Sequence, residues 1–158
     1  MLNRVFRALK LDADLYEEVE HDSQYLPEAA LIVVATSLLA GFGGWISGSF
    51  VAGFISLVLT GLLGWFVWSG VTLIVGTRIF GGTANYGEML RVLGYANAPL
   101  ALAIVPWVGL LVGSLWALVA SIVALRQGLD FTLGKAIGTA IVGWIVLFIV
   151  RAVVISIF

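Results

Sequence analysis

Long apolar stretches fill most of this chain, and short polar segments separate them. The first, second and last stretches have at least the roughly 20 residues that a helix needs to cross a bilayer, and the third reaches this length when counted from Asn85. None shows the roughly ten-residue alternation of a barrel strand. Only helices or closed barrels satisfy all their backbone hydrogen bonds in lipid. The pattern therefore predicts an all-α fold, a polytopic bundle of membrane helices. From Ala29 onward its only charged residues are Arg78, Glu88, Arg91, Arg126, Asp130, Lys135 and Arg151.

The apolar stretches divide into about five transmembrane helices. Asn85 and Glu88 have the spacing of a capping box, so the third helix is expected to begin there, ahead of its apolar part. Pro99 and Pro106 each remove a backbone hydrogen bond, which predicts a kinked third helix and a sharp turn after it. Thr132 is the expected cap of the fifth. The five apolar spans are residues 29–48, 52–77, 92–105, 110–125 and 133–158.

Residues 1–28 are expected to form a separate segment before the membrane domain of residues 29–158. This start is not typical of a signal peptide, because acidic residues follow its basic ones. The acidic run from Asp12 to Glu28 is either a solvated linker or a tail that docks a partner. At 100° per residue an amphipathic helix is predicted in the membrane surface, as a passive anchor or a sensor of anionic lipid. One face carries Leu2, Val5, Phe6, Leu9, Ala13 and Tyr16, and the other Arg4, Arg7 and Lys10.

The distribution of Lys and Arg predicts the orientation of the bundle. With the N-terminus inside, seven basic residues fall in inner segments and none in the two outer turns. This excess predicts a cytoplasmic N-terminus and, with an odd number of spans, a C-terminus on the opposite side. Arg151 lies near the end of the last span, where its side chain is expected to reach the outer surface or an acid of a partner subunit.

The charged residues beside the third, fourth and fifth spans form the first candidate site. If the helices pack as one bundle, these residues lie together at the inner membrane boundary. Two interpretations are open: a structural clamp of ion pairs, or a site for anionic lipid headgroups, since guanidinium groups bind phosphate through two donors. The residues are Glu88, Arg91, Arg126, Asp130 and Lys135.

Tyr95, Asn97 and Pro99 form a second candidate site at the break in the third span. Polar groups beside a broken helix are typical of transport sites. The alternative is that they bind backbone groups that the break has freed.

Glycine pairs at four-residue spacing allow close helix packing, within one chain or between copies. They are Gly44 with Gly48, Gly109 with Gly113, and Gly134 with Gly138.

The composition narrows the possible chemistry. The chain has no cysteine and a single histidine, so thiolate chemistry and paired imidazole ligation within one chain are excluded. A net charge of -1 does not suggest a nucleic-acid partner. Neither Glu88 nor Asp130 lies in a recognisable catalytic motif. We therefore expect no enzyme activity and no cofactor.

Three segments resemble the Yip-domain family, named for Ypt-interacting proteins. They are GGTANYGEMLRVLGYANAPLAL at residues 81–102, LWALVASIVALRQGLDFTLGKAIGTAIVGW at residues 115–144, and LDADLYEEVEHD at residues 11–22. The resemblance implies five transmembrane helices, a cytoplasmic N-terminus and a non-enzymatic role. Eukaryotic relatives act in vesicle trafficking with prenylated small GTPases and in shaping membranes. The short form of this chain looks more like prokaryotic members.

These observations together predict a non-catalytic integral membrane protein, expected in a prokaryotic plasma membrane. It would serve as a scaffold, a membrane-shaping protein or an accessory subunit of a larger membrane complex. A transporter of small solutes, ions or lipids is the alternative. The expected partners are the lipid bilayer, other copies or other membrane proteins, and anionic lipid headgroups.

Overall fold

The regular structure described for this chain is helical. A computed structural model describes residues 1–46 and 54–157. Three of its helices are long and apolar enough to cross a membrane, over Ser23–Gly43, Ile55–Arg78 and Val108–Gly128. The elements are α1 (Leu2–Leu9), α2 (Ala13–His21), the 3-10 helix η1 (Ser23–Tyr25), α3 (Leu26–Ile46), α4 (Phe54–Arg78), α5 (Tyr86–Ala96), the 3-10 helix η2 (Ala98–Ile104), α6 (Val108–Gly128) and α7 (Leu133–Ile157).

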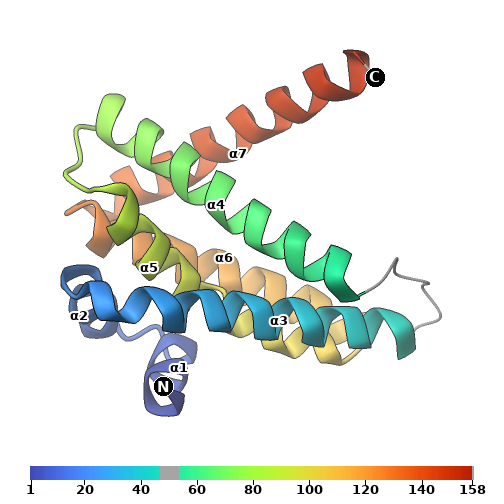
Figure 1. Cartoon of the computed structure of the whole chain (residues 1–158). Helices are drawn as coiled ribbons and strands as arrows, with labels where there is room; N and C mark the ends of the chain where they lie inside the picture. Colours follow the sequence, from blue (N-terminus) through green and yellow to red (C-terminus); the bar gives the residue numbers. More distant parts are fainter. Residues whose placement is uncertain (47–53, 158) are drawn as a thin grey trace.

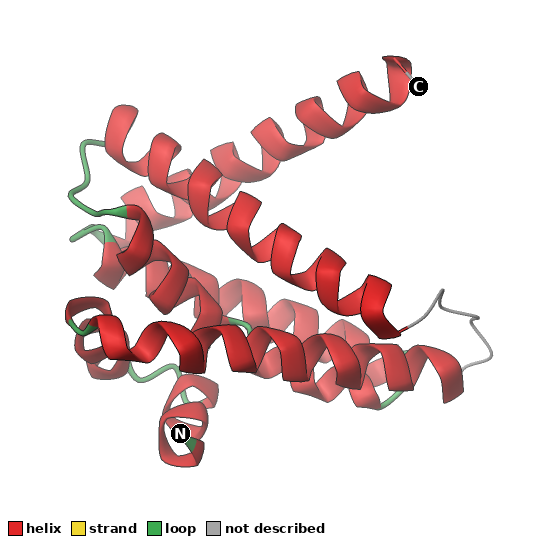
Figure 2. Ribbon diagram, in the orientation of Figure 1, coloured by secondary structure: helices red, strands yellow, loops and turns green. Residues whose placement is uncertain are grey.

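Helix α5 lies at the centre of the fold. It packs against α2, α3, α4 and α6, and its residues from Met89 to Ala96 are buried. In Figure 1 the long helices run back and forth beside it; α4 begins next to α3 and leans away from it toward Arg78, while α7 leans away from the bundle toward the C-terminus. Figure 2 shows that the described connections between the helices are short. The end where α2, the start of α5 and the α6–α7 turn meet is called the polar end below.

The third predicted helix is divided in two. The sequence predicts one kinked helix from Asn85 to residue 105, whereas α5 ends at Ala96 and the 3-10 helix η2 follows it. Pro99 lies in the first turn of η2, where its missing N–H costs no helical hydrogen bond. Trp107, with φ of 64°, ends the turn that leads into α6. The break is therefore a change of helix type as well as of direction.

The N-terminal segment folds differently from its prediction as one amphipathic helix. Leu11, with φ of 59°, separates α1 from α2, and the Asp12 side chain caps α2 by accepting from the Asp14 N–H. The predicted apolar face is therefore split between two helices. Leu15 and Tyr16 of α2 are fully buried in the core rather than in the membrane surface. Part of the acidic run is thus a helix docked on α5 and α6, with Asp14, Glu17 and Glu18 exposed on its outer side, and docking of a partner there stays a prediction.

Gly109, Gly113 and Gly138 of the predicted glycine pairs pack against other elements of the same chain. A Cβ on Gly109 would collide with the Leu102 carbonyl of η2, and one on Gly113 would lie 2.9 Å from the Pro99 carbonyl oxygen. Gly138 faces the Phe80 ring, whereas nothing lies within 4 Å of a Cβ on Gly134. Gly44 belongs to the last turn of α3, and its partner Gly48 lies outside the described residues.

Candidate functional site

The capping box predicted at the start of α5 is confirmed. The Asn85 side chain accepts from the Glu88 N–H at 3.0 Å, and the Glu88 carboxylate accepts from the Asn85 N–H at 2.7 Å. A Glu in the first turn also interacts favourably with the helix dipole. Glu88 is therefore committed to fixing the start of α5.

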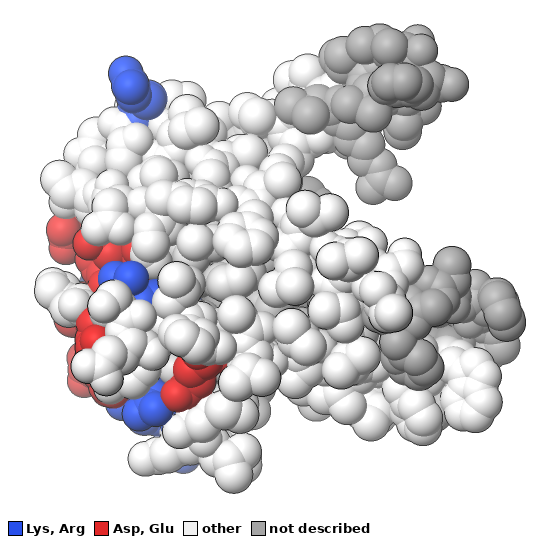
Figure 3. Space-filling model, in the orientation of Figure 1, with Lys and Arg blue, Asp and Glu red and all other residues white. Residues whose placement is uncertain are grey.

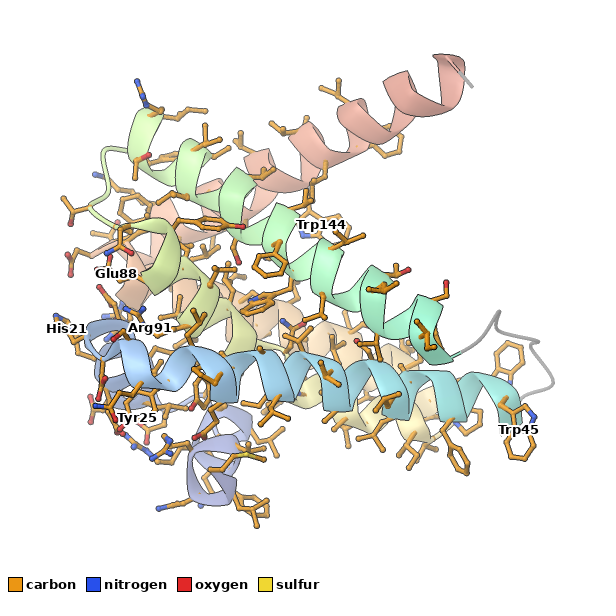
Figure 4. The ribbon with its side chains drawn as sticks, in the orientation of Figure 1. His21, Tyr25, Trp45, Glu88, Arg91 and Trp144 are labelled. Carbon is orange, nitrogen blue, oxygen red and sulfur yellow. The ribbon has the colours of Figure 1, made fainter. Side chains whose placement is uncertain are left out.

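Arg91 joins α5 to α2 through the backbone. Its guanidinium is buried, and it donates from Nε to the Val19 carbonyl at 2.7 Å and from Nη2 to the Glu20 carbonyl. These carbonyls belong to the last turn of α2, which has no later residues of its own helix to donate to them. Figure 4 shows Glu88, Arg91 and His21 together at this end. The arginine thus caps a helix about 70 residues away in sequence.

The remaining residues of the predicted clamp bind other groups at the polar end. Asp130 accepts from the Thr83 hydroxyl at 2.9 Å. Lys135 donates to the Phe80 carbonyl at 3.0 Å and lies over the Phe131 ring at 5.5 Å. Arg126 is exposed at the end of α6. In the described ranges, 1–46 and 54–157, no ion pair joins any two of the five predicted clamp residues.

The five residues nevertheless share one end of the bundle, as the sequence suggested. Glu88, Arg91, Asp130 and Lys135 make separate contacts there, which involve α2, the start of α5 and the turns before α5 and α7, whereas Arg126 is exposed. On the face shown in Figure 3 the charged side chains gather mainly at this end, and most of the remaining surface is uncharged. The charges thus link helix ends to loops and backbone carbonyls.

The ion pairs of the described structure lie instead around α1. Arg4 binds the Glu28 carboxylate with two donors, at 3.2 and 2.7 Å, and its guanidinium stacks 4.6 Å from the Tyr25 ring. Arg7 binds Asp12 at 2.7 Å and also pairs with Glu18. The neighbouring guanidinium holds the pKa of Asp12 below its usual range. The charged face of α1 is thus turned inward against the protein.

The apolar residues of α1 divide between the core and the outside: Ala8 is buried, Val5 and Leu9 pack against the core, and Leu2 and Phe6 face outward. Leu2 and Phe6 are 70% and 60% exposed. The indole N–H of Trp116 on α6 donates to the Leu9 carbonyl at 2.9 Å, which fixes the end of α1 against a membrane-length helix. The sequence predicted the apolar face of α1 but not the acids that pair with its arginines. Those acids belong to the acidic run.

Glu20 is a buried acid that the sequence analysis did not select. Its side chain is 7% exposed, and its Oε2 atom has no hydrogen-bond partner among the described residues. Burial raises the pKa of Glu20 to about 7, and the nearby Glu17, Asp130 and Glu88 act in the same direction, while His21 opposes them. The ends of α2 and α5 therefore enclose one acid that is costly to ionise.

The three residues at the helix break have separate roles. Asn97 donates from Nδ2 to the Leu93 carbonyl at 2.9 Å, so it binds a backbone group of the last turn of α5. Pro99 is buried in η2. Tyr95 is fully buried, and its hydroxyl has no partner among the described residues. The sequence therefore predicted the break but not the buried position of Tyr95. Asn97 lines the cavity described next, and Tyr95 does not.

A cavity of about 330 Å³ lies beside this break, between η2, α4, α6 and α7. Asn97, Ser114 and Ser121 contribute its polar groups, and Trp68 and Trp144 lie on its α4 and α7 sides. The two indoles contact edge to face, with centroids 6.0 Å apart. Within the described residues, no group of three or more His, Asp or Glu side chains could hold a metal ion.

The long apolar helices and the uncharged bundle define an integral membrane protein with helical spans. The chain belongs to the Yip1 family, because the Yip1 domain model matches residues 14–155. This match covers nearly the whole chain and confirms the resemblance drawn from the sequence. No curated protein and no solved structure matches the chain.

Proposed function

We propose that this protein is a non-catalytic scaffold of the membrane, with the polar end and the N-terminus in the cytoplasm and the C-terminus on the opposite side. The observation that carries the proposal is the docking of α2 through Arg91, which makes the N-terminal segment a fixed part of the bundle. The polar end is therefore an ordered surface of helix ends. Such a surface suits an accessory subunit that binds other membrane proteins or further copies of itself.

Helix α1 supports an additional role in shaping the membrane. With Arg4 paired to Glu28 on its inner side and Leu2 and Phe6 on its outer side, α1 presents an apolar edge that lipid would cover. In Figure 1, α1 lies below α3 toward the polar end, and it contacts α2, α5 and η2, so it would meet one leaflet only. Area added to a single leaflet favours curvature. The exposed Lys10 and Arg126 are available to bind anionic lipid headgroups.

The orientation is tested by single cysteines in this cysteine-free chain. Cysteines at Thr83, Thr132 and Phe158 are treated in intact cells with a reagent that does not cross membranes. We expect labelling at Phe158 alone, because Thr83 and Thr132 belong to the polar end. Labelling at Thr83 would overturn the topology. Permeabilised cells, in which all three sites should react, are the control.

The scaffold role is tested by affinity purification in mild detergent after cross-linking in cells. Specific partners or copies of the chain should be recovered with the intact protein. They should be lost from Arg91→Gln, which frees α2, and retained by Lys10→Gln, which removes an exposed charge from the same segment. Equal recovery from both variants would argue against the polar end as the binding surface.

A transporter is the second candidate, because Asn97 lines a cavity at a broken helix. Reconstituted protein should show no saturable flux of ions or small solutes above empty liposomes if the scaffold proposal holds. A saturable flux that Asn97→Leu abolishes would favour transport. Ser37→Ala, on α3 away from that cavity, is the matched control.

A further inference from the structure

The cavity beside Asn97 continues into a second one along the seam between α6 and α7. The first measures about 330 Å³ and the second about 430 Å³, and Leu118, Ala140 and Trp144 line both. Together they form a long depression, named here the α6–α7 groove. The residues that line it carry no charge. Figure 4 shows Trp144 in the space between α7 and α4, at the side of this groove.

The groove lies at the middle of the membrane span. Helix α6 has 21 residues, and Ser114 and Ser121 are seven apart on either side of its midpoint at Leu118. At about 1.5 Å per residue, each hydroxyl lies within roughly 6 Å of that midpoint along the helix. The third polar group, Asn97, stands where α5 gives way to η2. All three polar groups therefore face hydrocarbon depth, far from the lipid headgroups.

These polar groups have hydrogen-bonding capacity to spare. Several hydroxyls in the other long helices donate to a backbone carbonyl one turn earlier, while those of Ser69 and Thr139 have no partner among the described residues. The donating hydroxyls are those of Thr36, Ser37, Thr60, Thr72 and Thr77. Within the described residues Ser114 and Ser121 make no such bond, and Asn97 uses only one of its donors. An unmade hydrogen bond in hydrocarbon is costly, so an occupant that supplies polar atoms is favoured over a bare alkyl chain.

The size and chemistry of the groove define its occupant. A helix is about 10 Å across and does not fit a cavity of 330 Å³, whereas a single hydrocarbon tail does. The uncharged lining disfavours a phosphate or carboxylate. We propose that the α6–α7 groove binds an uncharged amphiphile, a lipid with a long tail, a hydroxyl or carbonyl group, and no charged headgroup to hold it at the membrane surface. This site is independent of the scaffold surface at the polar end.

Photolabelling of the full-length protein in phosphatidylcholine liposomes tests the proposal. The probe is dioleoylglycerol with a diazirine on one acyl chain, and the comparison probe is phosphatidylcholine with the same chain. The glycerol probe should label α6 and α7 peptides of the groove, and unlabelled dioleoylglycerol should compete. The phosphatidylcholine probe should label lipid-facing helices without such competition. Equal labelling of all helices by both probes would overturn the proposal.

Two variants locate the site. Ala117→Phe fills the groove and should abolish the competed labelling, whereas Val119→Phe, on an exposed face of the same helix, should leave it unchanged. Replacing Ser114 and Ser121 by alanine keeps the helix and removes the hydroxyls. That variant should need about tenfold more dioleoylglycerol to compete, the effect of roughly one lost hydrogen bond.

Competed labelling that survives both changes would place the lipid elsewhere and refute the groove. Cross-linked dimers in which the groove peptides are protected from both probes would show a second copy as the occupant. That result would also overturn the proposal. Scaffold partners recovered through the polar end are unaffected by either outcome, because the two sites share no residue.

Discussion

Replacing Glu20 by glutamine should remove a pH-dependent weakness in the docking of α2. The side chain is buried against α5 while its Oε2 atom lacks a partner among the described residues. Arg91 is adjacent, but the two hydrogen bonds that it makes go to the carbonyls of Val19 and Glu20 and not to the carboxylate. Ionised Glu20 is therefore a poorly compensated buried charge, and the amide has nearly the same shape without it.

The size of the pH effect on α2 docking follows from the pKa of Glu20, which burial raises from 4.5 to about 7. Docked α2 then holds a proton that undocked α2 releases, so docking weakens as the pH rises above about 4.5 and levels off above about 7. A tenfold change in proton affinity corresponds to about 1.4 kcal/mol, which limits the full effect to about 3 kcal/mol. Between pH 5 and pH 8 the wild-type docking equilibrium should weaken by nearly two orders of magnitude.

Hydrogen exchange of the α2 backbone amides measures this equilibrium directly. After correction for the intrinsic exchange rate, wild-type protection should fall between pH 5 and pH 8, and that of Glu20→Gln should stay nearly constant. The titration of His21 must be removed from the comparison, because the hydrogen bond between its ring and the Glu17 carbonyl raises the pKa of that ring. A raised histidine pKa also weakens docking as the pH rises, so both proteins should carry His21→Gln.

The matched control is Glu17→Gln, which removes an exposed carboxylate from the same helix. It should retain most of the wild-type slope with pH. The reasoning would be refuted if Glu20→Gln lowered α2 protection at pH 8, because the carboxylate would then be making a favourable interaction. An unchanged slope in that variant would equally show that another group controls docking.

Two further predictions concern packing and the backbone cap. Arg91→Gln should destabilise α2 docking by roughly 3 kcal/mol, since charge-assisted hydrogen bonds contribute about 1.5–3 kcal/mol each. The α2 amides should then lose protection from hydrogen exchange, whereas Lys10→Gln should leave their protection unchanged. Gly113→Ala places a Cβ 2.9 Å from the Pro99 carbonyl oxygen and should cost about 1–3 kcal/mol, seen as a lower melting temperature in detergent by tryptophan fluorescence. Gly64→Ala, with nothing within 4 Å of its Cβ, should not lower it.

Much of the membrane domain could be predicted from the sequence because its signals are local. Continuous apolar runs identify spanning helices, and the Asn85 and Glu88 spacing identifies a helix start. The proline positions also located the break near residue 97. They could not show that a 3-10 helix follows, because that depends on how η2 packs against α3 and α6. The five-span topology and the orientation stay predictions.

The charged site was harder to predict because its contacts are made with backbone groups and with distant segments. Arg91 and Lys135 look like partners for Glu88 and Asp130 when only side chains are counted. In the folded chain Arg91 binds the carbonyl end of α2, and such acceptors exist at every helix end, so they leave no residue-type signal. Glu20 was not predicted as a buried residue, because nothing in the sequence distinguishes it from the other acids of the acidic run.

The contacts of Arg91 also determine how the N-terminal segment can move. If α2 left the bundle, Leu15 and Tyr16 would lose their apolar surroundings, and a buried guanidinium on α5 would lose its two backbone acceptors. Stranding a buried cation is far more costly than breaking an exposed ion pair. Undocking of α2 must therefore disturb the start of α5, the central helix. A partner that binds the polar end would consequently sense the protonation of Glu20 and the packing of α5 together.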